Sequence, residues 1–262
     1  MSELEGWLNI YLQEVKLINA YFLYWLSMFF YITMQVMETI SLGARVSGKF
    51  SGSSSLGVTL HQSFSTLSRI FLPVFLIITA FLVERGMSSQ ELEKYALTGV
   101  GLSFLISLFL FIKIELVYKY FSIVISMLSK HSLPIALILA LFAKFSSYTD
   151  ADGFINYTGS KKRPLPKIVL LSFLSYFLLS SGILLSFLVA IHYPDYRLTA
   201  VQFSALFHGA GVVILAFYIN PSFSLIMDSN SSTLLSYSDS VLIGKLLGLL
   251  FTFLVFLIIY IL

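Results

Sequence analysis

The stretch IVLLSFLSYFLLSSGILLSFLVAI, residues 168–191, contains no charged side chain. At about 1.5 Å of rise per residue, a helix of this length crosses the roughly 30 Å hydrocarbon core of a bilayer. A second stretch, VLIGKLLGLLFTFLVFLIIYIL at residues 241–262, is also apolar apart from Lys245. These two runs predict an integral membrane protein whose fold is decided by membrane-spanning helices.

Working outward from these runs, the same criterion predicts six transmembrane helices. The chain of 262 residues is 58% apolar and only 11% charged, with a mean hydropathy of +0.90. No polar stretch is long enough to form a second domain. The sequence therefore predicts an all-α, polytopic helix bundle, with one transmembrane domain over residues 1–262. We place the six spans at residues 17–37, 60–83, 96–118, 168–191, 200–219 and 241–262.

Two segments outside the spans have helical character of their own. Apolar residues recur at helical spacing in 1–16, which lacks the basic start of a signal peptide, so we expect an interfacial helix there. Residues 121–145 contain two apolar halves, each too short to cross a bilayer. We expect them to form amphipathic or re-entrant helices within a cytoplasmic loop over 119–167. A seventh span at 121–145 is the alternative.

Lysine and arginine set the expected orientation. The positive-inside rule places the loop between the third and fourth spans in the cytoplasm, and six spans then leave both termini outside. A seventh span at 121–145 would instead place the N-terminus inside. The cations of this loop are Lys119, Lys130, Lys144, Lys161, Lys162, Arg163 and Lys167.

Composition also excludes several classes of site. The chain has no cysteine, which rules out disulfides, thiolate metal ligands and cysteine nucleophiles. Its formal net charge of +3 suits a membrane protein better than a nucleic-acid binder. The HExxH zinc motif, the Gly-x-Ser-x-Gly elbow and the Walker phosphate loop are all absent from the sequence. The chain thus has no visible ATPase domain, and any transport would take its energy from an ion gradient or from substrate mass action. We expect no catalytic residues, no metal and no cofactor.

Glu38 and Arg45 lie at the end of the first predicted span. Charge in that setting is expensive, which makes each residue a functional candidate. The two are seven residues apart, so they share a helical face if the helix continues past residue 37. They could border a polar cavity, or form an ion pair at a helix end with Arg45 snorkelling to water.

Arg69 is the deepest cation in the chain by its place in a predicted span. His61, Ser65 and Ser68 share one helical face beside it. A guanidinium donates two parallel hydrogen bonds to phosphate, so this span predicts an anion-binding site. The alternative is an ion pair between Arg69 and Glu38 that joins two helices.

Polar groups also occur in the fifth predicted span. Gln202 and His208 lie within it, and Asn220 follows its end. His208 could donate to a neighbouring helix, contact a substrate or carry a proton.

Lys245 lies one to two turns into the last predicted span, where its side chain can snorkel to the interface. Gly244 and Gly248 flank it. Their spacing of four residues is typical of a helix-packing face, although the motif is common in membrane helices.

Four segments resemble, in order along the chain, the Amj family of bacterial lipid II flippases, which act as an alternate to MurJ. Three positions depart from the family pattern, since His208 stands where Asn is expected, Asn220 where Asp is expected and Leu249 where Thr is expected. The segments are METISLGARV at 37–46, SFSTLSRIFLP at 63–73, the stretch from YRLTAVQFS to NPSFSLIMD at 196–228, and LIGKLLGLL at 242–250.

The resemblance implies a flippase of lipid II, the undecaprenyl-pyrophosphate-linked peptidoglycan precursor, in the bacterial cytoplasmic (inner) membrane. Lipid II and membrane lipids are the implied partners, nucleic acid is not, and the oligomeric state is left open. Moving the headgroup requires a cationic cavity that opens sideways to the bilayer. Glu38 would hold an Arg when the cavity is empty, or bind a coupling proton. The candidate substrate-binding residues are Glu38, Arg45, Ser68, Arg69, Gln202, His208, Asn220 and Lys245.

Other functions share this composition. A secondary transporter of a small solute, or a flippase of another polyprenyl-linked lipid, would also contain buried charges. A structural subunit would pair those charges with partner helices. A membrane enzyme of lipid carriers would need paired acids or a metal site, for which the sequence offers His131, Asp150, Asp152 and Asp228.

Overall fold

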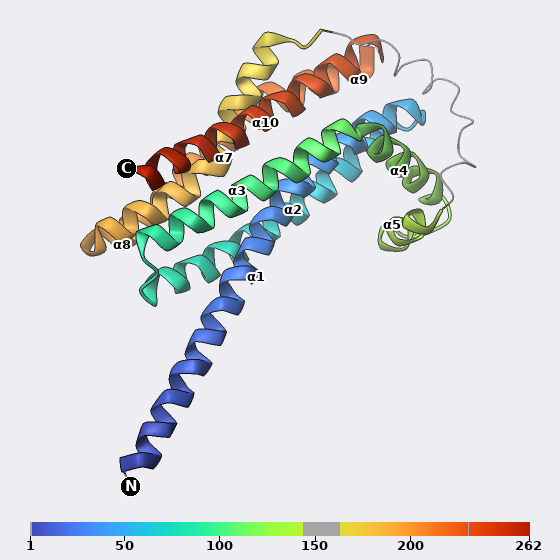
Figure 1. Ribbon diagram of the computed structural model, residues 1–262. Coiled ribbons are helices and arrows are strands. Elements are labelled where there is room, and N and C mark those ends of the chain that lie inside the picture. The colour runs from blue at the N-terminus through green and yellow to red at the C-terminus, as the bar shows by residue number, and fades with distance from the viewer. Residues whose placement is uncertain (1, 144–162, 230) are drawn as a thin grey trace.

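Six helices of the computed structural model are long and apolar enough to cross a membrane (Figure 1). The structure describes residues 2–143, 163–229 and 231–262, and the side chains of 20–143, 163–228 and 233–262. Within these residues no strand occurs, which confirms the predicted polytopic helix bundle. Asp150, Asp152, Lys144, Lys161 and Lys162 lie outside the described residues.

Five of the six spans are single helices and the other is composite. Pro194–Asp228 is built from the 3-10 turn η2 (Pro194–Tyr196), α8 (Arg197–Ile214), the π-helical turn η3 (Leu215–Ile219) and α9 (Asn220–Ser229). The single helices are α1 (Ser2–Phe50), α2 (Ser54–Glu84), α3 (Ser89–Ile112), α7 (Pro166–His192) and α10 (Ser231–Ile261).

Several predicted span boundaries differ from the ends of the helices, notably the ends of the first and third spans. The first helix does not end at residue 37 but runs on to Phe50, just before Gly52 with its positive φ of 69°. The third helix ends at Ile112 rather than residue 118, because the backbone turns at Lys113 (φ −103°, ψ 26°) and starts a new helix. Hydropathy could not locate this break, since the sequence is apolar on both sides of it.

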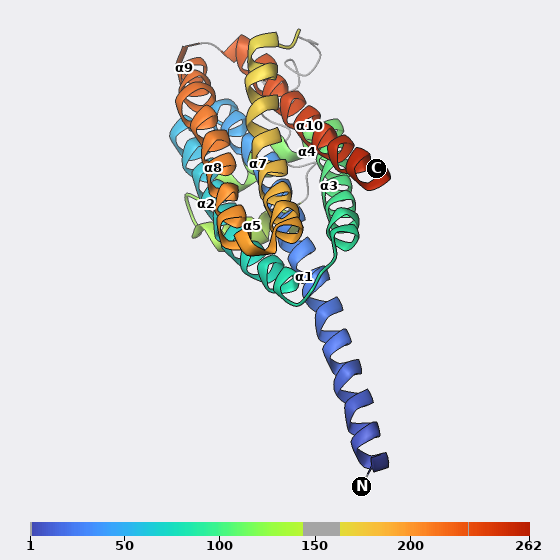
Figure 2. The same cartoon turned by 90° about the vertical axis from the view of Figure 1, so that its left-hand side faces the viewer.

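The segment after Lys113 forms two short helices, α4 (Ile114–Met127) and α5 (Leu133–Phe142). Neither is long enough to span a bilayer, in agreement with the expected short helices. At the other end of the chain, residues 2–16 continue directly into the first span as part of α1, which projects beyond the other helices in both views (Figures 1 and 2). The interfacial position of this stretch stays a prediction.

The bundle consists of two halves (Figure 2). In the N-terminal half, α1 packs along α2 and against α3 and α4, while in the C-terminal half α7 packs along α8 and α10. The main seam between the halves runs where α3 lies along α10. On the opposite side, α2 and α8 hardly contact each other. The halves are therefore joined firmly along one edge and weakly along the other.

Glycines allow the close helix contacts within each half. A Cβ added to Gly57 of α2 would lie 2.7 Å from the Cα of Gly48 in α1, so the two backbones touch. A Cβ on Gly244 would lie 2.5 Å from the Cβ of Ser172 in α7, and one on Gly248 would lie 2.8 Å from a backbone nitrogen of that helix. The predicted packing face around Lys245 is thus present and faces α7.

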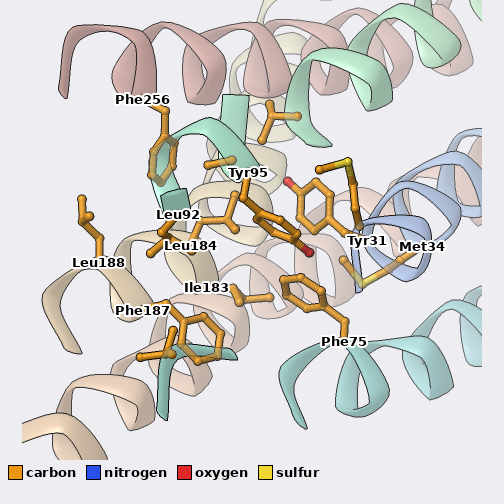
Figure 3. Close-up of a cluster of buried hydrophobic side chains, with 14 of the residues drawn as sticks. Tyr31, Met34, Phe75, Leu92, Tyr95, Ile183, Leu184, Phe187, Leu188 and Phe256 are labelled. Carbon is orange, nitrogen blue, oxygen red and sulfur yellow. The ribbon is translucent and has the colours of Figure 1, made fainter. Parts of the chain in front are cut away.

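An aromatic core fills the end of the bundle remote from α4 and α5 (Figure 3). Tyr31, Phe75, Tyr95 and Phe187 are at most 1% exposed there, and Tyr31 and Phe75 lie with ring centroids 5.4 Å apart. The core draws on α1, α2, α3, α7 and α10, and therefore ties both halves together at this end.

Candidate functional site

A cavity lies between the two halves of the bundle. α1 and α2 form one wall, and α7, α8, η3 and α10 form the other. The space open to the centre of a water molecule is about 60 Å³. Polar and charged groups make up much of the lining: Glu38, Ser41, His61, Ser65, Ser68, Arg69, Tyr176, His208 and Asn220.

Helical periodicity explains why these side chains meet. Residues 34, 38, 41 and 42 of α1 line the cavity, as do residues 61, 65, 68 and 72 of α2. Steps of three and four residues place side chains on one helical face. The expected shared face of His61, Ser65 and Ser68 is therefore present, and it points inward.

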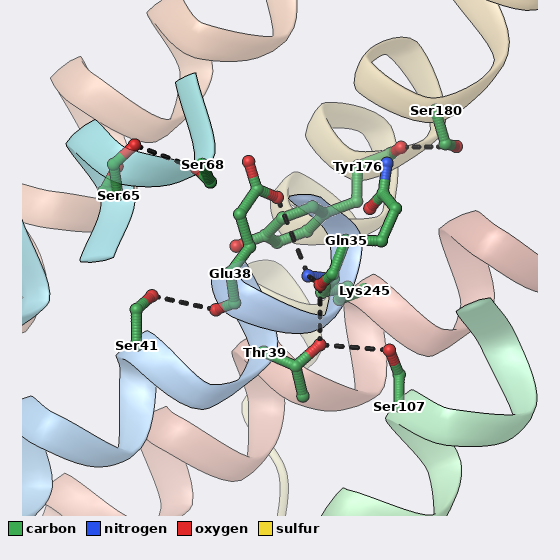
Figure 4. Close-up of polar contacts among 10 residues, drawn as sticks. All are labelled: Gln35, Glu38, Thr39, Ser41, Ser65, Ser68, Ser107, Tyr176, Ser180 and Lys245. Atoms are coloured by element: carbon green, nitrogen blue, oxygen red, sulfur yellow. Dashed lines mark hydrogen bonds and ion pairs between the residues drawn. The ribbon is translucent and has the colours of Figure 1, made fainter. Parts of the chain in front are cut away.

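Lys245 of α10 is the best-defined charge of the site (Figure 4). Its Nζ lies 3.6 Å from Glu38 Oε2 and donates a hydrogen bond of 2.6 Å to the backbone oxygen of Gln35. The Lys245 side chain is 1% exposed, whereas that of Glu38 is 21% exposed and lines the cavity. The expected snorkelling of Lys245 is wrong, because α1 supplies it with a carboxylate and a carbonyl in place of water. This contact joins the two halves near the middle of the bundle.

Further groups fix the partners of Lys245. The hydroxyl of Thr39 donates to the same Gln35 oxygen at 3.1 Å and lies 3.1 Å from the Ser107 hydroxyl of α3. The ring of Tyr176 lies 4.9 Å from Lys245 Nζ. Gln35 and Thr39 were not predicted as site residues from the sequence. A polar Gln one helical turn before Glu38, inside an apolar span, could have indicated a polar face there.

Arg45 of α1 is buried one helical turn beyond the cavity-lining Ser41. It is 4% exposed, and its guanidinium carbon lies 5.1 Å from the ring centroid of Phe223 in α9. Its Nε and Nη1 have no hydrogen-bond partner within the described part of the chain. The prediction that Arg45 snorkels or pairs with Glu38 is wrong, since Glu38 faces Lys245 and Arg45 turns into the C-terminal half.

Arg69 lines the cavity from α2 but is exposed. The expectation that it is the deepest cation is wrong, because Lys245 and Arg45 are both far more buried. The described residues contain no ion pair between Arg69 and Glu38. Arg69 thus lines the cavity from α2, the helix that hardly contacts α8.

The remaining predicted residues divide into two groups. Ser68, His208 and Asn220 line the cavity, and the buried Nδ1 of His208 has no hydrogen-bond partner among the described residues. Gln202 does not line it, because it is exposed and lies on a different face of α8 from His208.

The charges of this region do not balance. Glu38 and Arg69 line the cavity, whereas Lys245 and Arg45 are buried beside it without lining it. Glu38 pairs with Lys245, so these four residues carry three positive charges and one negative charge. Unpaired charge within a membrane is costly and marks a binding site or a transport path. No group of three His, Asp or Glu side chains suitable for a metal occurs in the described part of the chain. The arrangement can bind an anion and donate hydrogen bonds to it.

The sequence matches the family Amj, described as "Alternate to MurJ", over residues 30–258. All the cavity-lining residues lie within this match. No curated protein and no solved structure matches the chain.

Proposed function

The chain belongs to the Amj family, and from that premise we propose that it is a multi-pass lipid II flippase of the bacterial cytoplasmic membrane. Its task is to carry a pyrophosphate-linked sugar-peptide headgroup through the bilayer while the polyprenyl tail stays in lipid. The observation that carries the proposal is the positive charge within the membrane-spanning bundle: Arg69 lines the cavity, and Lys245 and Arg45 are buried beside it with Glu38 as the one paired carboxylate.

Arg69 is the residue that first meets the pyrophosphate. Its exposed guanidinium borders the cavity at the weak contact between α2 and α8, the side through which a lipid headgroup can enter. A bidentate guanidinium suits phosphate oxygens, and Ser68 and His208 line the same space as further hydrogen-bonding groups. The tail then remains outside the bundle.

Glu38 acts as a stand-in for the substrate. In the empty cavity its carboxylate neutralises Lys245, which would otherwise be an unpaired buried cation. An entering phosphate offers Lys245 an alternative anion. This role differs from the one implied by the family resemblance only in the partner, which is Lys245 rather than an arginine.

The size of the cavity requires the halves to move. A space of about 60 Å³ holds a few water molecules and not a sugar-peptide headgroup. The broad contact of α3 with α10 suits a hinge, whereas α2 and α8 can separate at little cost. We infer that the halves rock about the α3–α10 seam and that the cavity opens between α2 and α8.

Arg45 and Phe223 contact each other one helical turn beyond the cavity-lining Ser41. Their contact joins α1 to α9 and thus the two halves. Separation of the halves at this end would expose the two free guanidinium nitrogens of Arg45 to a phosphate. The same end of the bundle carries Lys113, Lys119, Lys130, Arg163 and Lys167, and we place it in the cytoplasm.

Complementation in cells tests the proposal. The chain is expressed in a bacterium depleted of its own lipid II flippases, and outer-leaflet lipid II is followed with a toxin that modifies the headgroup. Wild type should restore growth and toxin-modified lipid II, and Arg69→Ala should lose about tenfold or more of that signal at equal protein level, because a charged contact to the anion is removed.

Arg85→Ala is the matched control for Arg69→Ala. Arg85 is also an exposed arginine, but it follows the C-terminal end of α2, lines no part of the cavity, and lies over the Phe81 ring at 4.2 Å. It should rescue like wild type. Membrane insertion without rescue would reject lipid II as the substrate, and full rescue by Arg69→Ala would reject the phosphate-binding role of Arg69.

A further inference from the structure

A second hollow lies on the outer face of the bundle, where α7 and α10 run together. It is a groove of about 550 Å³ and shares no lining residue with the central cavity. Every side chain that lines it is apolar: Pro164, Pro166, Val169, Leu170 and Phe173 on the α7 side, and Ile243, Leu247, Leu250, Phe251 and Leu254 on α10. Such a lining offers nothing to a sugar or a peptide, but it suits a hydrocarbon chain.

The packing of α7 against α10 makes this groove a fixed feature. Gly244 and Gly248 bring the two helices into backbone contact beneath it. The ring of Phe251 lies 5.7 Å from that of Phe173 and 5.1 Å from that of Phe177, measured between centroids. Edge-to-face aromatic contacts of this kind hold side chains in one arrangement.

One end of the groove is cationic. Arg163 precedes the lining residue Pro164 and Lys167 follows Pro166, and both cations are exposed. The first turn of α7 contains no acidic residue. The backbone N–H of Leu165, between the two prolines, donates to the Ser240 hydroxyl at 2.7 Å, which fixes this end against α10.

One acidic residue lies close to this end in the sequence of α10. Asp239 precedes Ser240, but the described residues contain no ion pair between Asp239 and either Arg163 or Lys167.

We propose that the α7–α10 groove binds an anionic phospholipid, with an acyl chain along the groove and its phosphate at Arg163 and Lys167. The combination of an all-apolar slot and two cations at one end matches a lipid that carries a net negative charge. A zwitterionic lipid fills the slot equally well but gains less from the cations. The proposal does not depend on the transported substrate, because the groove and the cavity are separate.

Tryptophan quenching by brominated lipids tests this directly. Trp7 and Trp25 are changed to Phe, and Leu247→Trp places a single reporter in the groove, since Leu247 lines it and is 43% exposed. The protein is reconstituted in mixtures of phosphatidylglycerol and phosphatidylcholine, with bromine on the chains of one lipid at a time. The relative affinity follows from the ratio of the two quenching curves.

Leu105→Trp in the same background is the control reporter. Leu105 is a 58% exposed residue of α3 outside the groove. We expect phosphatidylglycerol to be favoured about fivefold or more at Leu247→Trp, and hardly at all at Leu105→Trp. When Arg163→Gln and Lys167→Gln are added to Leu247→Trp, the ratio of the affinities for phosphatidylglycerol and phosphatidylcholine should fall close to one.

Three results would overturn the proposal. Equal quenching by both lipids at Leu247→Trp would mean that the groove is an ordinary lipid-facing surface without preference for an anionic lipid. Absence of quenching by either lipid would mean that a second copy or another protein covers the groove. An unchanged preference in the Arg163→Gln and Lys167→Gln variant would remove the role of the cations. If that variant does not fold, concentrated salt on the Leu247→Trp protein screens the same charges and must reduce the preference.

Discussion

The aromatic core and the central cavity both bury polar groups, but they treat them in opposite ways. In the aromatic core, the Ser27 hydroxyl lies 2.7 Å from the Thr79 hydroxyl and 2.8 Å from that of Tyr95, so three neutral groups satisfy one another. In the cavity region, Arg45 Nε and Nη1 and His208 Nδ1 have no hydrogen-bond partner among the described residues. The buried hydroxyls of the aromatic core are thus satisfied within the protein, whereas these three nitrogens near the cavity are not.

The difference separates structural from functional polarity. A hydrogen bond between membrane helices contributes about 0.6 kcal/mol on average, a modest gain that holds helices in register. An unpaired cation in the same environment costs at least about 2.5 kcal/mol. Arg45 would therefore be replaced by an apolar residue if stability alone mattered. The hydroxyl contacts are explained by stability alone, and the unpaired cation is not.

The largest effect that this comparison predicts is that of Lys245→Ala. The substitution leaves Glu38 as an unpaired buried carboxylate, and loss of one partner of a buried pair costs about 3–5 kcal/mol. We expect a strongly lowered unfolding temperature in detergent and no measurable flipping. Thermal unfolding of the purified protein and the toxin assay measure the two losses.

The double variant Glu38→Gln with Lys245→Met separates folding from function. It removes both charges and should recover most of the unfolding temperature. Flipping should stay lost, because the cation that meets the phosphate is gone. A double variant that flips at the wild-type rate would show that the pair is only structural.

The next largest effect is that of Arg45→Met, which should raise stability and lower activity. Arg45→Met removes an unpaired buried charge but keeps a long side chain against Phe223. We expect the free energy of unfolding to rise by about 1 kcal/mol or more, while flipping falls about tenfold. Unfolding temperature and flipping are compared on the same preparation. A loss of both would mean that an unseen partner pairs with Arg45, and its role as an open cation would fail.

Arg69→Lys tests the geometry of the anion contact rather than its charge. Arg69 is exposed and has no ion pair in the described structure, so the unfolding temperature should not change. A lysine keeps the charge but loses the two parallel hydrogen bonds to phosphate. We expect flipping to fall a few-fold, between wild type and Arg69→Ala. Full activity in Arg69→Lys would reduce the site to a simple positive potential.

The fold was predictable because hydrophobic length is a local property. The apolar runs at residues 168–191 and 241–262 each predict a span from their own length and composition. The break at Lys113 was not predictable, since the helix stops inside an apolar stretch and resumes at once.

The partners of the charged residues depend instead on how the helices are arranged. Glu38 meets Lys245 because α1 and α10 are neighbours in the bundle although far apart in sequence. Helical spacing correctly grouped His61, Ser65 and Ser68, which lie on one helix. It could not decide between Arg45, Arg69 and Lys245 as the partner of Glu38.

The smallest predicted effect lies in the aromatic core and completes the comparison. Thr79→Val removes the hydroxyl that bonds Ser27 while keeping the shape of the side chain. Ser27 retains Tyr95 as a partner, so the free energy of unfolding should fall by only about 0.6 kcal/mol. Flipping should equal that of wild type, because Thr79 lines no part of the cavity.

Ser68→Ala is the matched variant, because it removes a buried hydroxyl that does line the cavity. Thermal unfolding and the toxin assay are carried out on both variants. A flipping defect in Thr79→Val as large as that in Ser68→Ala would show that the aromatic core and the cavity do not differ in function.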